Sequence, residues 1–104
     1  MRVSRSQGGY SEMIAKNYVN DAKPVYCLST ELIPQYEWVD SRPTTNIVGY
    51  SAWFTQEGLE PFKVKFGAKV KLPEYLTKVE LQGLEACEVR NNVYFRASGI
   101  KEDK

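Results

Sequence analysis

The sequence predicts an all-β protein: a small antiparallel barrel of five to six strands with an N-terminal extension. The clearest evidence is residues 62–72, where apolar residues hold the even positions and lysines hold every odd position except Gly67. A period of two over eleven residues is typical of a strand with one buried and one solvated face. In addition, short strand-like runs follow one another along the chain, joined by turn-forming residues and with no crossover helix.

Residues 1–24 are interpreted as the N-terminal extension, which is expected to be partly mobile. Its first nine residues are polar and end in Gly-Gly, a sequence that breaks regular structure. Residues 11–20 predict a short helix with Ser11 as its N-cap and with Ile14 and Tyr18 one turn apart. Ten residues are too few for a stable isolated helix, so this helix is expected to dock.

Strand signals begin at Val25, and the β domain is expected to span residues 25–98. The first three strands are predicted at residues 25–28, 31–39 and 47–56. Residues 40–46 contain turn formers and a proline, which predicts a loop. In the third strand, alternation places Val48, Tyr50, Ala52 and Phe54 on one face and Ile47, Ser51, Trp53 and Thr55 on the other.

The basic strand is predicted at residues 62–72. Its core face is Phe62, Val64, Phe66, Val70 and Leu72, and Lys63, Lys65, Lys69 and Lys71 face solvent. A two-residue turn at Gly67 would place lysines in the core, so one continuous strand, kinked at Gly67, is favoured. A three-residue loop there would keep the same parity and remains an alternative.

The last strands are predicted at residues 77–81, 84–89 and 93–97, after a compact connection at residues 72–76. Residues 90–92 are expected to form a three-residue turn, which pairs Val89 with Val93 and Cys87 with Phe95 and buries all four. A two-residue Asn-Asn turn is the alternative, and it would bury Glu88. Residues 99–104 are interpreted as a charged tail.

Five-stranded Greek-key barrels of the oligonucleotide-binding type fit this strand count. An SH3-like barrel and a half-open sandwich are the competing folds.

Composition excludes several classes of function. Histidine is absent and only Cys27 and Cys87 could act as thiol ligands, so zinc sites and histidine-based catalysis are not expected. The sequence therefore predicts no enzyme activity, no metal and no cofactor. No signal peptide and no long apolar run is evident, which favours a cytoplasmic protein with free thiols and no membrane segment.

The lysine row permits two interpretations. Lysines on an exposed strand prevent aggregation between strand edges. They could equally follow a polyanion, since same-face residues lie about 7 Å apart along a strand and no acidic residue interrupts the row. The net charge is only +1, so attraction to nucleic acid must come from the placement of charge.

Exposed aromatic residues are a second feature typical of a nucleic-acid-binding surface. Alternation places Trp53 and Tyr50 on opposite faces of their strand, and it places Tyr94 on the solvent face of the last strand, beside Arg96. Such rings stack on bases at roughly 1–3 kcal/mol per base. They could instead cover a barrel end or a protein interface. Arg42, in the loop of residues 40–46, could project as part of a wing.

Residues 61–101 resemble the second half of the gene V type of single-stranded DNA-binding protein from filamentous phages. The shared features are the basic strand, the corner Pro73-Glu74-Tyr75, an alternating strand and a final hairpin that ends in a basic residue. The chain also resembles small accessory proteins of bacterial mobile elements. The first resemblance implies that Arg42, Tyr50 or Trp53, and Tyr94 with Arg96 contact the single strand.

The sequence thus predicts a non-enzymatic, sequence-tolerant protein that binds single-stranded DNA or RNA and forms a homodimer. The alternative is a protein-interaction or inhibitor module on the same small barrel, in which exposed aromatics are interface anchors.

Overall fold

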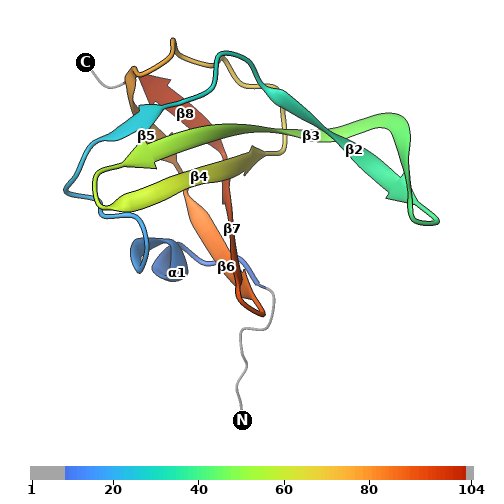
Figure 1. Cartoon of the computed structure of the whole chain (residues 1–104), viewed down its shortest axis with the longest axis horizontal. Helices are drawn as coiled ribbons and strands as arrows, with labels where there is room; N and C mark the ends of the chain where they lie inside the picture. The colour runs from blue at the N-terminus through green and yellow to red at the C-terminus, as the bar shows by residue number, and fades with distance from the viewer. Residues whose placement is uncertain (1–8, 103–104) are drawn as a thin grey trace.

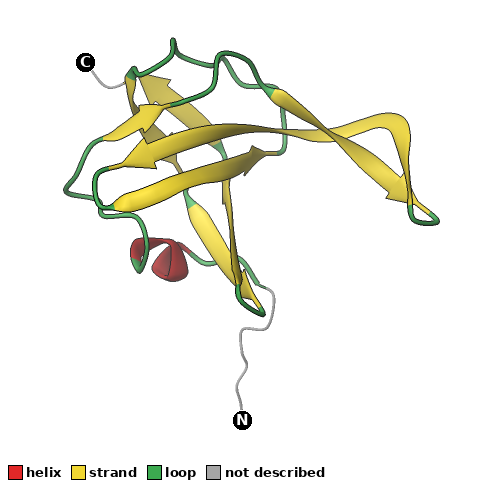
Figure 2. Ribbon diagram, in the orientation of Figure 1, coloured by secondary structure: helices red, strands yellow, loops and turns green. Residues whose placement is uncertain are grey.

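A computed structural model describes residues 9–102 of the chain (Figure 1). In this part of the chain the elements are α1 Glu12–Lys16, β1 Val25–Cys27, β2 Ile33–Val39, β3 Arg42–Gln56, β4 Leu59–Phe66, β5 Lys78–Gln82, β6 Glu85–Val89, β7 Asn92–Ala97 and β8 Gly99–Glu102. The all-β class is confirmed, with one short helix at the margin of the sheet (Figure 2). The expected number of five to six strands is wrong, because the described residues form eight.

All eight strands belong to one sheet in the order β6-β7-β4-β3-β1-β5-β8, and β2 pairs with β3 beside this path. The pairing of β4 with β7 is parallel, whereas every other strand pair is antiparallel, so the purely antiparallel arrangement is wrong. The order ends at β6 and β8, which leaves the sheet open. Closure into an oligonucleotide-binding barrel therefore stays a prediction.

The core face of β4 agrees with the alternation of its sequence. Phe62, Val64 and Phe66 are buried, and Lys63 and Lys65 are exposed. Phe66 and Phe54 of β3 lie with ring centroids 6.3 Å apart in an edge-to-face arrangement, a favourable geometry for aromatic rings.

The expected continuous strand through residue 72 is wrong, because β4 ends at Phe66. Phe66 is the last residue of β4 that pairs with either neighbour, with Tyr50 of β3 and with Ala97 of β7, and β3 continues beyond this point paired only with β2. Beyond this point the chain leaves the sheet. Val70 and Leu72 still pack, half-buried, against the core, while Lys69 and Lys71 remain exposed.

Residues 40–46 do not form the expected loop. The chain turns at Asp40 and Ser41, with φ of 50° and 65°, and β3 begins at Arg42. Two positive φ values are typical of the type I′ turn, whose twist matches that of two-residue hairpins. The result is a long two-stranded ribbon of β2 and the first half of β3, which projects from the body of the protein (Figure 1).

The hairpin of β6 and β7 has a different register from the one expected. Its turn is Arg90-Asn91, so Val89 pairs with Asn92 and Glu88 with Val93, and the three-residue turn is wrong. Arg90 supplies the left-handed residue, with φ of 57°, in place of an asparagine. In this register Val89 is 40% exposed rather than buried.

Both expected domain boundaries are corrected by the packing. Ser11 caps α1 as predicted, accepting hydrogen bonds from the backbone of Met13 and Ile14, but α1 is shorter than residues 11–20. Ala15 and Val19 lie in the core cluster, so this part of the extension belongs to the folded domain. Residues 1–8, to which the expectation of mobility mainly applied, lie outside the described residues.

The expected C-terminal tail is in part a strand. β8 pairs with β5, and the paired residues run from Val79 with Glu102 to Gln82 with Gly99. β8 therefore forms one edge of the sheet. Residues 103–104 lie outside the described part of the chain. Cys27 and Cys87 are free, buried thiols, and burial raises the pKa of Cys27.

Replacing Gly83 by alanine is expected to lower the free energy of unfolding by roughly 1–3 kcal/mol. Gly83 has a φ of +63°, and an added Cβ would lie 2.9 Å from Ser98 Oγ. Gly67→Ala is the matched control, because Gly67 has no heavy atom within 4 Å of a Cβ and no positive φ. Urea denaturation of both variants measures the difference, and equal stabilities would contradict the geometry at Gly83.

Candidate nucleic-acid interface

A groove opens where β4 and β7 separate. The two strands pair only between Val64 and Phe66 on β4 and between Phe95 and Ala97 on β7, and they diverge toward their N-terminal ends (Figure 1). The groove has a volume of about 580 Å³. Its lining comes from α1 and its flanks, β2, β3, β4 and β7: Tyr10, Tyr18, Gln35, Ser51, Trp53, Leu59, Glu60, Pro61, Phe62, Lys63, Lys65, Val93, Tyr94 and Phe95.

Strand register brings the predicted residues onto one outer face. Trp53 pairs with Lys63, and Lys65 pairs with Arg96. Tyr94 lies two residues before Arg96 on β7 and therefore shares its face. Lys63 Nζ lies 5.9 Å from the Trp53 ring centroid, within the range of a cation–π contact. Trp53 and Tyr94 are 40% and 48% exposed, so both rings keep area for a ligand.

Arg96 is held in place by two contacts. Its Nε donates to Glu85 Oε1 at 2.8 Å, and its guanidinium carbon lies 4.1 Å from the Tyr10 ring centroid. Burial raises the pKa of Tyr10, and the neighbouring Cys87 thiol adds to this effect. Arg96 is therefore pre-oriented, but part of its charge is already satisfied by Glu85.

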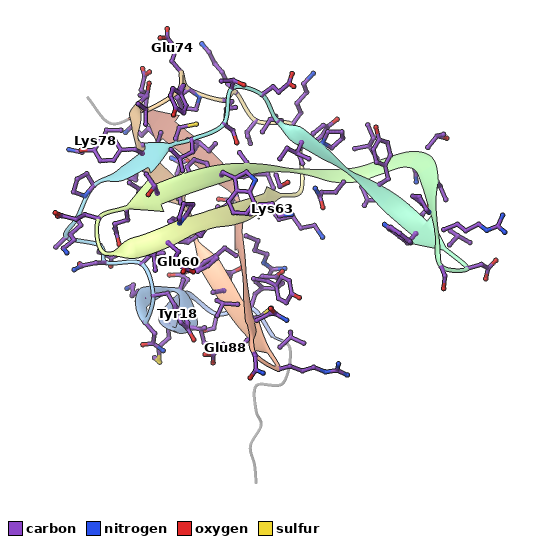
Figure 3. The ribbon with its side chains drawn as sticks, viewed as in Figure 1. Tyr18, Glu60, Lys63, Glu74, Lys78 and Glu88 are labelled. Atoms are coloured by element: carbon purple, nitrogen blue, oxygen red, sulfur yellow. The ribbon has the colours of Figure 1, made fainter. Side chains whose placement is uncertain are left out.

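The opposite end of the groove is tied to the β6–β7 hairpin. The Tyr18 hydroxyl donates a hydrogen bond to a Glu88 carboxylate oxygen, and this bond raises the pKa of Tyr18. Figure 3 shows both side chains in the region between α1 and this hairpin. The contact also gives the Glu88 carboxylate a hydrogen-bond partner.

A β-bulge adds an acidic group to the groove. Gln56 pairs with Leu59, whereas Phe54 pairs with Phe62, so β4 has one residue more than β3 in this interval. The extra residue leaves both Glu60 and Pro61 exposed, and both line the groove. The lining thus carries Lys63 and Lys65 against Glu60, a formal charge of +2 − 1 = +1.

Not all predicted residues lie at the groove. Arg42 begins β3 at the tip of the ribbon, and Tyr50 pairs with Phe66, so its side chain is half-buried at the end of the core face. Lys69 and Lys71 follow the end of β4 and are absent from the lining. Among the described residues none of the four lysines forms an ion pair, so their ammonium groups are available to an anion.

Several lining residues were not predicted from the sequence. Tyr10 follows Gly-Gly, and no local signal indicates that it stacks on Arg96 from the other end of the chain. Tyr18 was expected only to dock the helix. Its hydroxyl was the one local feature that indicated a polar contact such as the hydrogen bond to Glu88. Gln35 donates to Ser51 Oγ at 3.0 Å, a cross-strand contact that requires the register of β2.

No protein-family model, no curated protein and no solved structure matches this chain. Within residues 9–102, no group of three or more metal-ligating side chains gathers. No helix in the same residues is long and apolar enough to cross a membrane.

Proposed function

We propose that the chain binds single-stranded nucleic acid, with DNA as the first candidate, without catalysis and with little dependence on sequence. The observation that supports this most is the convergence of Trp53, Lys63, Lys65, Tyr94 and Arg96 on one outer face around the groove. Exposed rings beside unpaired cations are the elements that single-strand binders combine.

In the proposed complex, Lys63 and Lys65 neutralise consecutive phosphates, since same-face residues of a strand lie about 7 Å apart. Trp53 and Tyr94 flank Lys63 on the two neighbouring strands and offer their rings to bases. Arg96, fixed by Glu85 and Tyr10, contacts the backbone at the paired end of the groove. No metal or cofactor takes part.

The proposal retains three expectations from the sequence: a curved sheet used like that of an oligonucleotide-binding barrel, a cytoplasmic setting and a homodimer. Arg42, Tyr50, Lys69 and Lys71 are no longer central to it. Arg42 and the two lysines could contact nucleic acid only where the strand extends beyond the groove.

The double change Lys63→Gln and Lys65→Gln is expected to weaken binding at every sequence tested. It should reduce the slope of log affinity against log salt by about 1.4, because each phosphate contact of a single strand contributes roughly 0.7. Fluorescence anisotropy with a labelled oligonucleotide of mixed sequence measures both quantities. The matched control, Lys69→Gln with Lys71→Gln, changes the net charge equally but should alter the slope less. Equal effects of the two pairs would exclude the groove as the phosphate site.

The alternative function is a protein-interaction or inhibitor module. The near balance of charge in the groove favours it, because Glu60 lies in the lining and Glu85 neutralises Arg96. Salt separates the two functions: affinity for nucleic acid falls steeply as salt rises, whereas affinity through aromatic anchors changes little. If the unmodified protein in low salt retains no single-stranded DNA or RNA at tens of micromolar, the nucleic-acid function is excluded.

A further inference from the structure

The projecting ribbon carries an unusual amount of exposed apolar surface. Six large hydrophobic side chains of the ribbon are exposed: Ile33, Tyr36, Trp38, Val39, Ile47 and Val48. Trp38 is 66% exposed, more than any other aromatic residue in the described part of the chain. A two-stranded ribbon without a covering layer is at best marginally stable in water. Its composition therefore indicates a partner.

The ribbon has two free edges, one on β2 and one on residues 42–49 of β3, which pair only with β2, and the edge on β2 is the one without a basic residue. β2 pairs with β3 on one side and with no other strand of the described residues. Natural edge strands usually carry lysines or other charges that prevent pairing with a second chain. β2 has the sequence IPQYEWV, in which Glu37 is the single charged residue and no lysine is present. By comparison, the eight residues of β4 include two lysines. The protection of the β2 edge is limited to Pro34 near its beginning and to two irregularities in its pairing with β3, between Gln35 and Tyr36 and between Tyr36 and Trp38.

We propose that β2 pairs antiparallel with β2 of a second copy of this chain, about a two-fold axis at Tyr36. In this register Tyr36 lies opposite Tyr36 of the copy, Pro34 opposite Trp38, Ile33 opposite Val39, and Gln35 opposite Glu37. Every apolar residue therefore meets an apolar residue. The Gln35–Glu37 pairs lie on the same face as Ile33 and Val39, opposite to the face of Tyr36 and Trp38. A two-fold interface needs such self-complementarity, and it continues the ribbon into a four-stranded sheet.

Charge is compatible with this pairing. The two Glu37 carboxylates lie diagonally rather than directly opposite, and each faces a neutral amide. Trp38 is 66% and Tyr36 42% exposed, so in two copies these residues expose roughly 500 Å². Pairing along the edge covers the flanks of these side chains and leaves the faces of the sheet open, so this area is the upper limit of their contribution to the about 1,000 Å² that a stable interface needs.

The ribbon is a poor surface for nucleic acid. Residues 33–48 carry Glu37, Asp40 and Arg42, which gives −2 + 1 = −1, so the phosphate backbone would gain no net attraction. The pairing of two copies does not rest on the proposed nucleic-acid function, and the two surfaces share only Gln35, which lines the groove and lies in the paired strand.

Light scattering after size exclusion tests the proposal directly. The full chain is expected to have twice the monomer mass at tens of micromolar, and Tyr36→Lys is expected to be monomeric, because two ammonium groups would meet at the axis. Tyr75→Lys is the matched control: Tyr75 is 56% exposed and lies outside the ribbon, so this variant should stay dimeric. A monomeric unmodified chain, or a Tyr36→Lys variant that stays dimeric, overturns the proposal.

Cross-linking tests the register even if Tyr36→Lys folds poorly. Directly opposed residues of antiparallel strands have Cα atoms about 4.5–5.5 Å apart, which suits a disulfide. Tyr36→Cys should therefore form a covalent dimer under mild oxidation. Glu37→Cys should not, because its diagonal distance to the same residue of the copy is about 7–8 Å. The unmodified chain is the blank, since Cys27 and Cys87 are buried. Absence of the Tyr36→Cys product, or equal yields from both variants, excludes this register.

Discussion

Replacing Phe66 by alanine is expected to lower the free energy of unfolding by about 3–5 kcal/mol, the usual effect of removing a buried phenylalanine. Phe66 is completely buried and is the residue at which β4 pairs with both Tyr50 of β3 and Ala97 of β7. Its removal leaves a cavity where the two halves of the sheet meet. Small domains have a total stability of about 5–15 kcal/mol, so the variant should be substantially unfolded in moderate urea.

Met13→Ala is the control for this experiment. Met13 is 76% exposed on α1, and alanine is a good helix former, so the change should alter stability by less than about 0.5 kcal/mol. Chemical denaturation followed by tryptophan fluorescence and by circular dichroism measures both variants. A loss below about 1 kcal/mol for Phe66→Ala would mean that its site can collapse or that the core is placed wrongly.

Tyr94→Ala and Trp53→Ala are each expected to weaken single-strand binding by about 1–3 kcal/mol, or about 5- to 150-fold. Stacking releases few counterions, so the dependence of affinity on salt should hardly change. The lysine variants should show the opposite pattern, with a clear change in salt dependence. Anisotropy titrations at several salt concentrations separate the two effects.

Substitutions that keep a ring define the cause of this loss. Tyr94→Phe and Trp53→Phe should retain most of the affinity, because stacking needs the ring face rather than the polar atom. Tyr75→Ala, at an exposed position outside the groove, should bind normally. If the phenylalanine variants bind as weakly as the alanine variants, hydrogen bonds rather than stacking hold the ligand.

The parts of the fold that depend on local alternation were predictable. The period of two in β4 identified Phe62, Val64 and Phe66 as buried and Lys63 and Lys65 as exposed, because side-chain direction is fixed within one strand. The end of β4 was not predictable. The same parity continues to Leu72, although pairing with β3 and with β7 ends at Phe66, and β3 continues beyond Tyr50 paired only with β2.

Turns were predicted less well, because their residues departed from the usual preferences. Ser41 and Arg90 adopt positive φ without being glycine or asparagine, so composition indicated the two turn regions but not the two residues that form each turn. An error of one residue in the turn after Val89 changed every partner in the final hairpin. The projecting ribbon was missed for the same reason, since residues 40–46 resembled a loop.

For the candidate groove, the direction of its side chains was predictable from the sequence, but their assembly on one surface was not. Alternation indicated that Trp53, Lys63, Lys65 and Tyr94 point away from the core, and local sequence contains that information. Their meeting on one surface depends on the parallel pairing of β4 with β7, and Tyr10 and Glu60 depend on a distant stacking contact and a β-bulge. These features arise from pairing between distant segments, for which the local pattern of the sequence has no signal.

The parallel pairing of β4 with β7 has a consequence during synthesis on the ribosome. Phe66 and its partner Ala97 are about 30 residues apart, and at about 5–20 residues per second the ribosome needs roughly 2–6 s to add the intervening chain. During this interval the hairpin of β3 and β4 has no partner along its open edge, where Phe62 and Val64 are not yet covered by Phe95 and Phe66 is not yet paired with Ala97. Exposed apolar edges of this kind are where nascent chains associate wrongly. Lys63 and Lys65 on β4 would then protect the hairpin of the nascent chain against pairing with other chains, before the groove that they later line has formed.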